Sequence, residues 1–270
     1  MHTLLITLLL CCLSMSAAAK TALVVVHYGT TVAETRVKTI DAILSDIQSA
    51  NPTLEVREAY IAAMVRSRLE KRSIHKDSPL DAMLRLHLEG YDTIYVQPTL
   101  LLDGIEMSLL REDVAKATSF FRAVHLGTPL LYTLDDCRRF LTVLESEQPQ
   151  KGGAVLWVGH GNALASTATY AMLNSMLADD GCNRHFVSTI EGYPNAGNAI
   201  TALHKAKAKS VTLIPMLLVC GDHTLNDING TVRQALTKSG INATTQLKGL
   251  GERPEVRQLY VDKTRELLSR

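Results

Sequence analysis

The stretch VTLIPMLLVCGDHTLN, residues 211–226, contains the pattern that decides the fold. Its first ten residues are almost all apolar, which is typical of a strand buried on both faces of a parallel sheet and extended by a short apolar connection. The apolar run ends at Gly221, and Thr224 is a suitable N-cap for the helix that the next residues predict. His223 is therefore predicted to lie between a buried strand and a helix, at the edge where open α/β sheets bind ligands.

Two other predicted strands end in the same way. Residues 155–158, VLWV, lead into Gly-His-Gly with His160 at its centre, and residues 186–190, FVSTI, lead into Glu191. Intervals of 31 and 32 residues separate His160, Glu191 and His223, and each is long enough for one crossover helix between parallel strands. We therefore predict that these three side chains form one group at a single edge of a sheet.

The composition narrows the class of protein. The chain has 270 residues, enough for two domains of ordinary size or one large one, and 46% of them are hydrophobic, so a substantial core is available. The formal net charge of +1 argues against a nucleic-acid-binding protein that relies on bulk electrostatics. The sequence leaves open whether the protein forms a homo-oligomer.

The first 19 residues have the form of a secretory signal peptide that is cleaved before Lys20. A short apolar core, residues 4–13, is followed by Ala17-Ala18-Ala19, and it is too short to span a bilayer. His2 stands where Lys or Arg is usual, and attachment of a lipid to Cys11 or Cys12 is a weaker alternative, because neither follows a small residue. We therefore predict a periplasmic protein with no membrane span in its mature chain.

Three cysteines remain in the predicted mature chain: Cys137, Cys182 and Cys220. An odd number gives no disulfide framework, and the spacing matches no zinc motif. Cys220 is predicted to pack as a small apolar residue near His223, rather than to bind metal.

The rest of the chain repeats the strand–helix alternation twice. Strands are predicted at residues 22–26, 54–59, 93–97 and 123–126 before the linker QPQKGG, residues 148–153, and the pattern then restarts. We predict an N-terminal α/β domain over residues 20–148 and a C-terminal α/β domain over residues 149–270 that carries the metal site.

The two predicted domains resemble each other. The segment VHYG, residues 26–29, matches VGHG, residues 158–161, and PTLLLDG, residues 98–104, matches PMLLVCG, residues 215–221. In this alignment Glu106 falls opposite His223. We predict a duplication that gives two domains, each a parallel sheet flanked by helices, facing each other across a cleft.

Two histidines and one glutamate can hold a divalent transition metal ion and leave positions open for a substrate. Such donors suit Co, Fe, Ni or Zn, and no H-E-x-x-H motif is present. The two histidines also have a structural interpretation: His160 as a turn residue at a strand end, and His223 as a helix-start residue that satisfies local backbone donors. If His223 binds metal, Asp222 beside it is placed to orient it. Glu191 taken alone favours neither a functional nor a structural interpretation. His27 either lines the cleft or is a core histidine.

These motifs together resemble one family over nearly the whole predicted mature chain. The pattern of VLWVGHG (155–161), EGYP (191–194) and GDHTLND (221–227) is similar to the anaerobic cobalt chelatase family CbiK, class II chelatases related to ferrochelatase. The resemblance implies that His160, Glu191 and His223 bind the metal and catalyse its insertion into sirohydrochlorin, a tetrapyrrole with eight carboxylates. Cobalt is favoured, with iron or nickel as alternatives.

The resemblance also implies which residues face the tetrapyrrole: His27, Tyr28 and Tyr193. The family usually has a small hydroxyl residue and Phe where this chain has His27-Tyr28, so the imidazole is interpreted as a second base, an extra metal contact or an axial ligand to haem. Two pyrrole protons must leave as the metal enters, and His or Glu can accept them. The sequence contains no Walker A loop, so ATP is not expected to take part.

Export is unusual for an enzyme of tetrapyrrole biosynthesis, so two other functions are kept as alternatives. One is a periplasmic haem- or metal-binding protein on a chelatase fold, serving iron or haem uptake. The other is a periplasmic binding protein for an unrelated small ligand, which would not need His160 and His223. Arg66 and Arg68 are weak candidates for binding substrate carboxylates.

Overall fold

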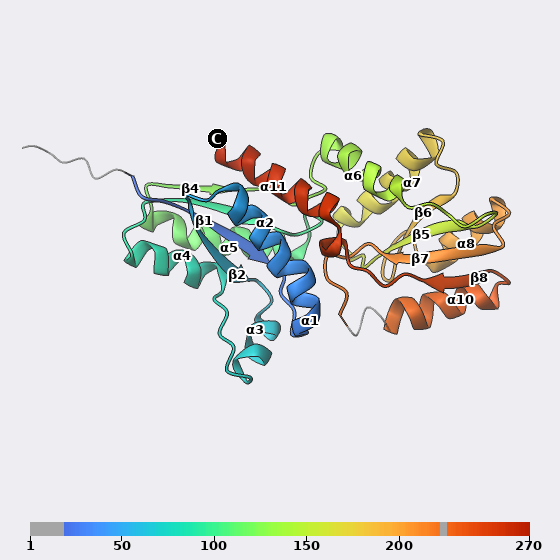
Figure 1. Ribbon diagram of the computed structural model, residues 1–270, viewed down its shortest axis with the longest axis horizontal. Helices are drawn as coiled ribbons and strands as arrows, with labels where there is room; N and C mark the ends of the chain where they lie inside the picture. Colours follow the sequence, from blue (N-terminus) through green and yellow to red (C-terminus); the bar gives the residue numbers. More distant parts are fainter. Residues whose placement is uncertain (1–18, 222–225) are drawn as a thin grey trace, which may run out of the picture.

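Two four-stranded parallel sheets, each flanked by helices, form the two halves of the molecule (Figure 1). This computed structural model describes residues 19–221 and 226–270. The predicted fold class is confirmed. Residues 1–18 of the predicted signal peptide, and the predicted metal ligand His223, lie outside the described residues. None of the helices in the described ranges is both long and apolar enough to span a membrane.

The N-terminal sheet has the strand order β2-β1-β3-β4. Its strands are β1 (Thr21–His27), β2 (Glu55–Tyr60), β3 (Thr93–Pro98) and β4 (Ala123–Leu126). Its helical segments are α1 (Ala33–Arg36), the π-helical η1 (Val37–Asp41), α2 (Ala42–Ala50), α3 (Ala63–Glu70), α4 (Pro79–Leu88), α5 (Ile105–Ala117), the 3₁₀ turn η2 (Thr118–Phe120) and α6 (Leu134–Ser146).

The C-terminal sheet repeats this topology with the order β6-β5-β7-β8. Its strands are β5 (Ala154–Gly159), β6 (His185–Thr189), β7 (Ser210–Pro215) and β8 (Asn242–Thr245). Its helical segments are η3 (Ala165–Thr167), α7 (Ala168–Asp179), α8 (Ala196–Lys205), the π-helical η4 (Asp227–Val232), α10 (Arg233–Lys238), η5 (Leu250–Glu252) and α11 (Pro254–Leu268).

The continuous apolar runs of β1 and β5 reflect burial of both faces of these central strands. Leu23 and Val25 of β1 and Trp157 of β5 join one apolar core that extends through both halves. Alternate residues point the other way, into a separate core for each half, as Val24 and Leu156 do. The strand predicted to begin at Val211 ends at Pro215, and residues 216–221 continue as an irregular connection.

The long helices that end the two halves connect them. Figure 1 shows α11, at the end of the chain, lying over the N-terminal half beside α2, and α11 also contacts β3 and α6. Arg257 of α11 pairs with Asp46 of α2 at 2.6 Å, and Lys263 pairs with the buried carboxylate of Asp136 on α6 at 3.0 Å. The last helix of the chain therefore packs across the predicted domain boundary between residues 148 and 149, against the N-terminal half.

The duplication is visible in matching hydrogen bonds at the carboxyl ends of the strands. In the N-terminal half, the backbone N–H groups of Ile61 and Ala62 donate to the carbonyls of His27 and Tyr28. In the C-terminal half, Ile190 and Glu191 donate to Gly159 and His160 in the same way. Position by position, Tyr28 therefore corresponds to His160, His27 to Gly159 and Ala62 to Glu191.

Candidate metal-binding site

The loops that follow β5 and β6 bring His160 and Glu191 to the same edge of the C-terminal sheet. The Ile190 N–H donates to the Gly159 carbonyl at 2.9 Å, and the Glu191 N–H donates to the His160 carbonyl at 2.8 Å. Both side chains are exposed to solvent. On the other side of β5, the Met216 N–H donates to the Val158 carbonyl at 2.8 Å, so the connection that follows β7 starts at this edge as well.

Two glycines let these loops approach so closely. Gly161 has φ +76°, and a Cβ there would overlap the Glu191 carbonyl group. Gly192 has φ +83°, and its Cβ would lie 2.8 Å from the Asn162 carbonyl oxygen. Only glycine adopts this backbone conformation without strain and leaves this space free. The glycines of the Gly-His-Gly and Glu-Gly patterns therefore allow the two candidate ligand loops to pack closely against each other.

The protonation of His160 follows from one hydrogen bond. Its Nδ1 lies 2.8 Å from the Gly161 carbonyl oxygen. A carbonyl only accepts, so Nδ1 carries the proton in the neutral ring and Nε2 keeps a free lone pair. This is the arrangement in which a histidine binds a metal ion or accepts a proton through Nε2.

The third predicted ligand, His223, lies outside the described residues, but the connection leading toward it is well anchored. The Leu250 and Gly251 N–H groups donate to the Leu217 and Leu218 carbonyls at 2.8 and 3.0 Å. Cys220 is buried, and burial, together with the charge of Glu252, raises the pKa of its thiol to about 12. Such a thiol remains protonated, which agrees with its predicted packing role. Within the described ranges, no three His, Cys, Asp or Glu side chains are grouped closely enough to hold a metal ion.

The structure separates His27 and Tyr28, which the sequence placed together at the tetrapyrrole. Tyr28 is 49% exposed, whereas His27 is completely buried. The His27 Nδ1 lies 2.7 Å from Thr99 Oγ1. Burial, assisted by the charge of Lys76, lowers the pKa of His27 to about 3, so its ring is neutral. This geometry fits a core histidine rather than one that lines the cleft. The His27 Nε2 has no hydrogen-bond partner among the described residues.

The opposite half contributes residues that the sequence singled out weakly or not at all. A Cβ on Gly104 would lie 3.5 Å from Asn162 Nδ2 and 3.5 Å from Glu106 Oε2, so the start of α5 meets the loop that follows His160. Glu106 was noted only as the counterpart of His223. The sequence does not single out Asn162, apart from its position directly after Gly-His-Gly. Its Oδ1 accepts a hydrogen bond from the Leu164 N–H at 2.7 Å, which fixes the loop.

Tyr193, Arg66 and Arg68 fall in three different environments. Tyr193 is 59% exposed, two residues beyond Glu191. Arg66 donates from Nη1 to the Tyr60 and Ile61 carbonyls at 2.5 and 2.8 Å, so it supports the loop that follows β2. Arg68 is exposed and forms no ion pair with any described residue, which leaves its guanidinium available to an anionic ligand.

Comparison with known proteins agrees with this geometry. The family model described as "Cobalt chelatase (CbiK)" matches residues 21–269. The chain is 30% identical to the sirohydrochlorin cobaltochelatase of Salmonella typhimurium over 249 residues, covering 90% of this chain and 94% of that protein. It is 27% identical to the sirohydrochlorin cobaltochelatase CbiKC of Nitratidesulfovibrio vulgaris over 220 residues, covering 78% of each.

A solved structure supports the same fold. SirB from Bacillus subtilis, solved with Fe3+, superposes with a TM-score of 0.68 at 15% identity, covering 92% of this chain and 95% of that one. At that identity the likeness concerns the fold alone. With the family model spanning both sheets and α11, the chain belongs to the CbiK cobalt chelatase family.

Proposed function

We propose that this protein is a sirohydrochlorin chelatase that inserts Co2+ into the macrocycle without ATP. The observation that carries this proposal is His160: its exposed ring has Nδ1 bonded to the Gly161 carbonyl, and it lies on a loop bonded to that of Glu191. The family membership and the names of the two curated relatives support both the substrate and the metal. Iron and nickel are the alternative metals, because the same donors suit them.

In this proposal, His160, Glu191 and His223 hold the incoming metal ion on the C-terminal side of the cleft. The counterpart positions in the N-terminal half are Tyr28 and Ala62, which offer an aromatic ring and a small side chain instead of ligands. This difference suits a flat macrocycle that rests against one half and receives the metal from the other. Tyr193, exposed next to Glu191, and Arg68, an exposed cation, are proposed to contact the ring and its carboxylates.

The reaction also requires a base, because two pyrrole N–H protons leave as the metal enters. The Nε2 lone pair of His160 is oriented by the fixed Nδ1–H and can accept one proton whenever it is not bound to metal. Glu191 is the second exposed acceptor on the adjoining loop. Holding both groups on loops that are bonded to each other provides the positioning that the chemistry needs.

The haem- or metal-binding alternative follows from the predicted export, and His27 as an axial ligand to haem mildly favours it. His27 is enclosed and hydrogen-bonded to Thr99, so no observation on this residue favours haem.

We also propose export through cleavage before Lys20. In support, β1 begins at Thr21, the Lys20 ammonium lies 3.9 Å from the centre of the Tyr91 ring, and cleavage there leaves every strand intact.

The test is a spectrophotometric insertion assay with sirohydrochlorin and Co2+, Fe2+ or Ni2+. We expect His160→Ala to lower the rate by at least about a hundredfold, the usual contribution of a positioned acid–base group. His204→Ala, which removes an exposed histidine of α8, is the matched control and should keep the wild-type rate. Wild-type insertion by His160→Ala, or no insertion by the wild-type protein with any of the three metals, would refute the proposal.

A further inference from the structure

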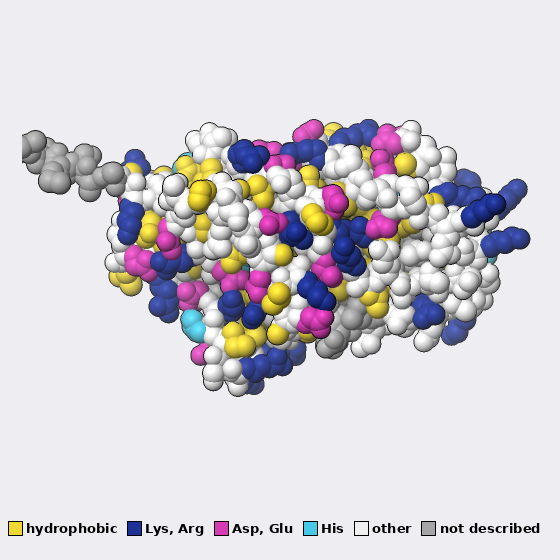
Figure 2. Space-filling view, in the orientation of Figure 1, with side chains coloured by type: hydrophobic (Ala, Val, Ile, Leu, Met, Phe, Trp, Pro, Cys, Tyr) yellow, Lys and Arg dark blue, Asp and Glu magenta, His cyan; other side chains and the backbone are white. Residues whose placement is uncertain are grey.

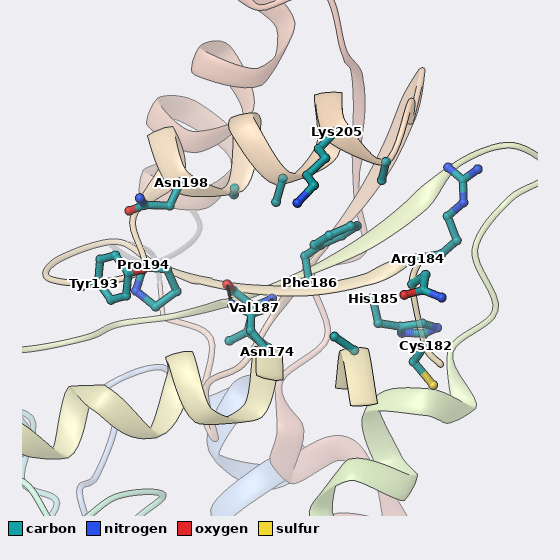
Figure 3. A pocket seen from close by; sticks show the side chains of 15 residues that line it. Asn174, Cys182, Arg184, His185, Phe186, Val187, Tyr193, Pro194, Asn198 and Lys205 are labelled. Carbon is teal, nitrogen blue, oxygen red and sulfur yellow. Dashed lines mark hydrogen bonds between the residues drawn. The ribbon is translucent and has the colours of Figure 1, made fainter. Parts of the chain in front are cut away.

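A groove of about 580 Å³ runs along β6, the outer strand of the C-terminal sheet, between α7 and α8 (Figure 3). It begins near Cys182 and His185 and ends at Tyr193 and Pro194. Cavities of this size commonly hold small organic molecules. The groove adjoins the candidate metal site through Tyr193 and Pro194, and its other lining residues have no role in the proposed chelatase reaction.

The strand edge in this groove is closed to another strand. The Val187 N–H donates to Asn174 Oδ1, and Asn174 Nδ2 donates to the Val187 carbonyl, both at 2.7 Å. On either side of Val187, the His185 N–H donates to the Cys182 carbonyl and the Thr189 N–H donates to the Pro194 carbonyl. With these outward N–H groups already bonded within the chain, an extended peptide gains no main-chain ladder here. The groove is therefore suited to a small molecule rather than to a β-strand of a partner.

The walls of the groove favour an apolar body of limited size. Phe186 lies in the groove beside β6 (Figure 3), and four alanines from α7, from α8 and from the residue after α8 also line it. The alanines are Ala178, Ala199, Ala202 and Ala206. Three amide side chains at the margin can orient a ligand through hydrogen bonds: Asn174, Asn183 and Asn198.

The charges of the groove are positive. Arg184 and Lys205 line it, and neither forms an ion pair with any described residue, whereas no Asp or Glu is among the lining residues. One guanidinium nitrogen of Arg184, Nη1, is buried and has no hydrogen-bond partner in the described part of the chain. Three acids outside the lining act on the end of the groove near Cys182 and His185: Glu145 on both, Asp180 on Cys182 and Glu147 on His185.

Two further observations agree with an anionic ligand. His185 lines the groove, is only 9% exposed, and has a ring Nδ1 without a partner among the described residues. The surrounding end of the molecule is also cationic: residues 192–221 contain no Asp or Glu but include Lys205, Lys207 and Lys209. Figure 2 shows dark blue side chains without neighbouring magenta ones at the extreme end of the C-terminal half.

We propose that this groove binds a small amphipathic organic anion, its apolar body over Phe186 and between the alanines, and its acidic group at Arg184 and Lys205. The cations supply charge-assisted hydrogen bonds, which are roughly twice as strong as neutral ones.

The test uses a fluorescent probe with these two properties, anilinonaphthalene sulfonate, titrated into the purified protein without metal or tetrapyrrole. We expect saturable binding at one site. Arg184→Gln and Lys205→Gln should each raise the Kd by about tenfold, the effect of losing one charged hydrogen bond. Lys209→Gln removes an equally exposed lysine that does not line the groove, and it should change the Kd by less than about twofold.

Two further experiments separate the contribution of the shape of the groove from that of the charge of the probe. Ala202→Leu adds bulk to the groove without changing charge, and it should abolish binding while the far-ultraviolet circular dichroism remains that of the wild type. Phenylnaphthylamine, which has the same rings without the sulfonate, should bind at least tenfold more weakly than the sulfonate. Equal affinity for the neutral probe, or unchanged binding by Ala202→Leu, would overturn the proposal. Because the assay contains no chelatase substrate, failure of the proposed insertion reaction would not affect its outcome.

Discussion

Replacing Gly161 by alanine tests whether the close approach of the His160 and Glu191 loops is what creates the candidate site. Gly161 has φ +76°, a conformation that costs an L-residue about 1–2 kcal/mol, and the added Cβ would overlap the Glu191 carbonyl group. The Cβ of a real residue essentially never approaches this closely, so the loop that carries Glu191 must move away, by roughly 1 Å or more in a tightly packed structure.

The expected consequence is a large loss of activity with a modest loss of stability. A displacement of about 1 Å at a reacting group lowers a rate by roughly a hundredfold, so kcat/KM for Co2+ insertion should fall by about that factor. Both loops lie at the sheet edge rather than in the core, so the free energy of unfolding should fall by only about 1–3 kcal/mol. The assay is initial-rate insertion into sirohydrochlorin, with unfolding followed in urea.

Gly181→Ala is the matched control. Gly181 has φ +79°, close to that of Gly161, but a Cβ there meets nothing within 4 Å. It therefore carries the conformational cost alone, about 1–2 kcal/mol, and should insert metal at the wild-type rate. If Gly161→Ala keeps wild-type kcat/KM, the approach of the two loops is not what organises the site, and the reasoning is wrong.

Three further predictions follow from buried groups. Cys220, whose pKa is raised to about 12, should resist iodoacetamide at pH 8 in the folded protein and react in urea, as mass spectrometry can determine; rapid labelling of the folded protein would contradict its burial. The pKa of His27 is lowered to about 3 from 6.5, so the unfolded chain takes up a proton first, and stability should fall as pH decreases from 6.5 toward 3. Urea titrations should give a shallower pH dependence for His27→Gln, and equal slopes would count against a buried neutral ring. Lys263→Met removes one of the two cations that contact the buried carboxylate of Asp136, the other being Arg139 at 2.8 Å, and should lower the free energy of unfolding by about 2 kcal/mol, whereas Arg265→Met, which breaks the exposed pair with Asp262, should cost less than about 1 kcal/mol.

Much of the fold could be predicted from the sequence because its central strands are buried on both faces. Continuous apolar runs such as those starting at Ala22 and Val155 allow few other structures, and the strand–helix alternation then requires parallel sheets. The crossing of α11 to the N-terminal half could not be predicted, because its amphipathic pattern indicates that one face is buried but not which sheet buries it.

The candidate site was predictable only in part. His160 and Glu191 could be placed at one edge because parallel strands end together, and their loops are bonded as expected. The sequence could not assign the exposed position in His27-Tyr28, because neighbouring residues of a strand point to opposite sides and a shift of one residue exchanges them. Glu106 and Asn162 lie near each other only through the packing of the two halves, which no local pattern encodes.

The duplication accounts for the division of roles that we propose, with metal ligands in one half and a surface for the macrocycle in the other. Both halves end their central strand with the same turn, and Gly29 and Gly161 both adopt positive φ, at +102° and +76°. The fold therefore presents the same two loop positions twice, occupied by Tyr28 and Ala62 on one side and by His160 and Glu191 on the other. At these two positions the imidazole and the carboxylate lie in the C-terminal half, which leaves the ring of Tyr28 free to support the macrocycle. An ancestral pair of identical loops could thus specialise by substitution at these positions alone, without any change in the backbone that presents them.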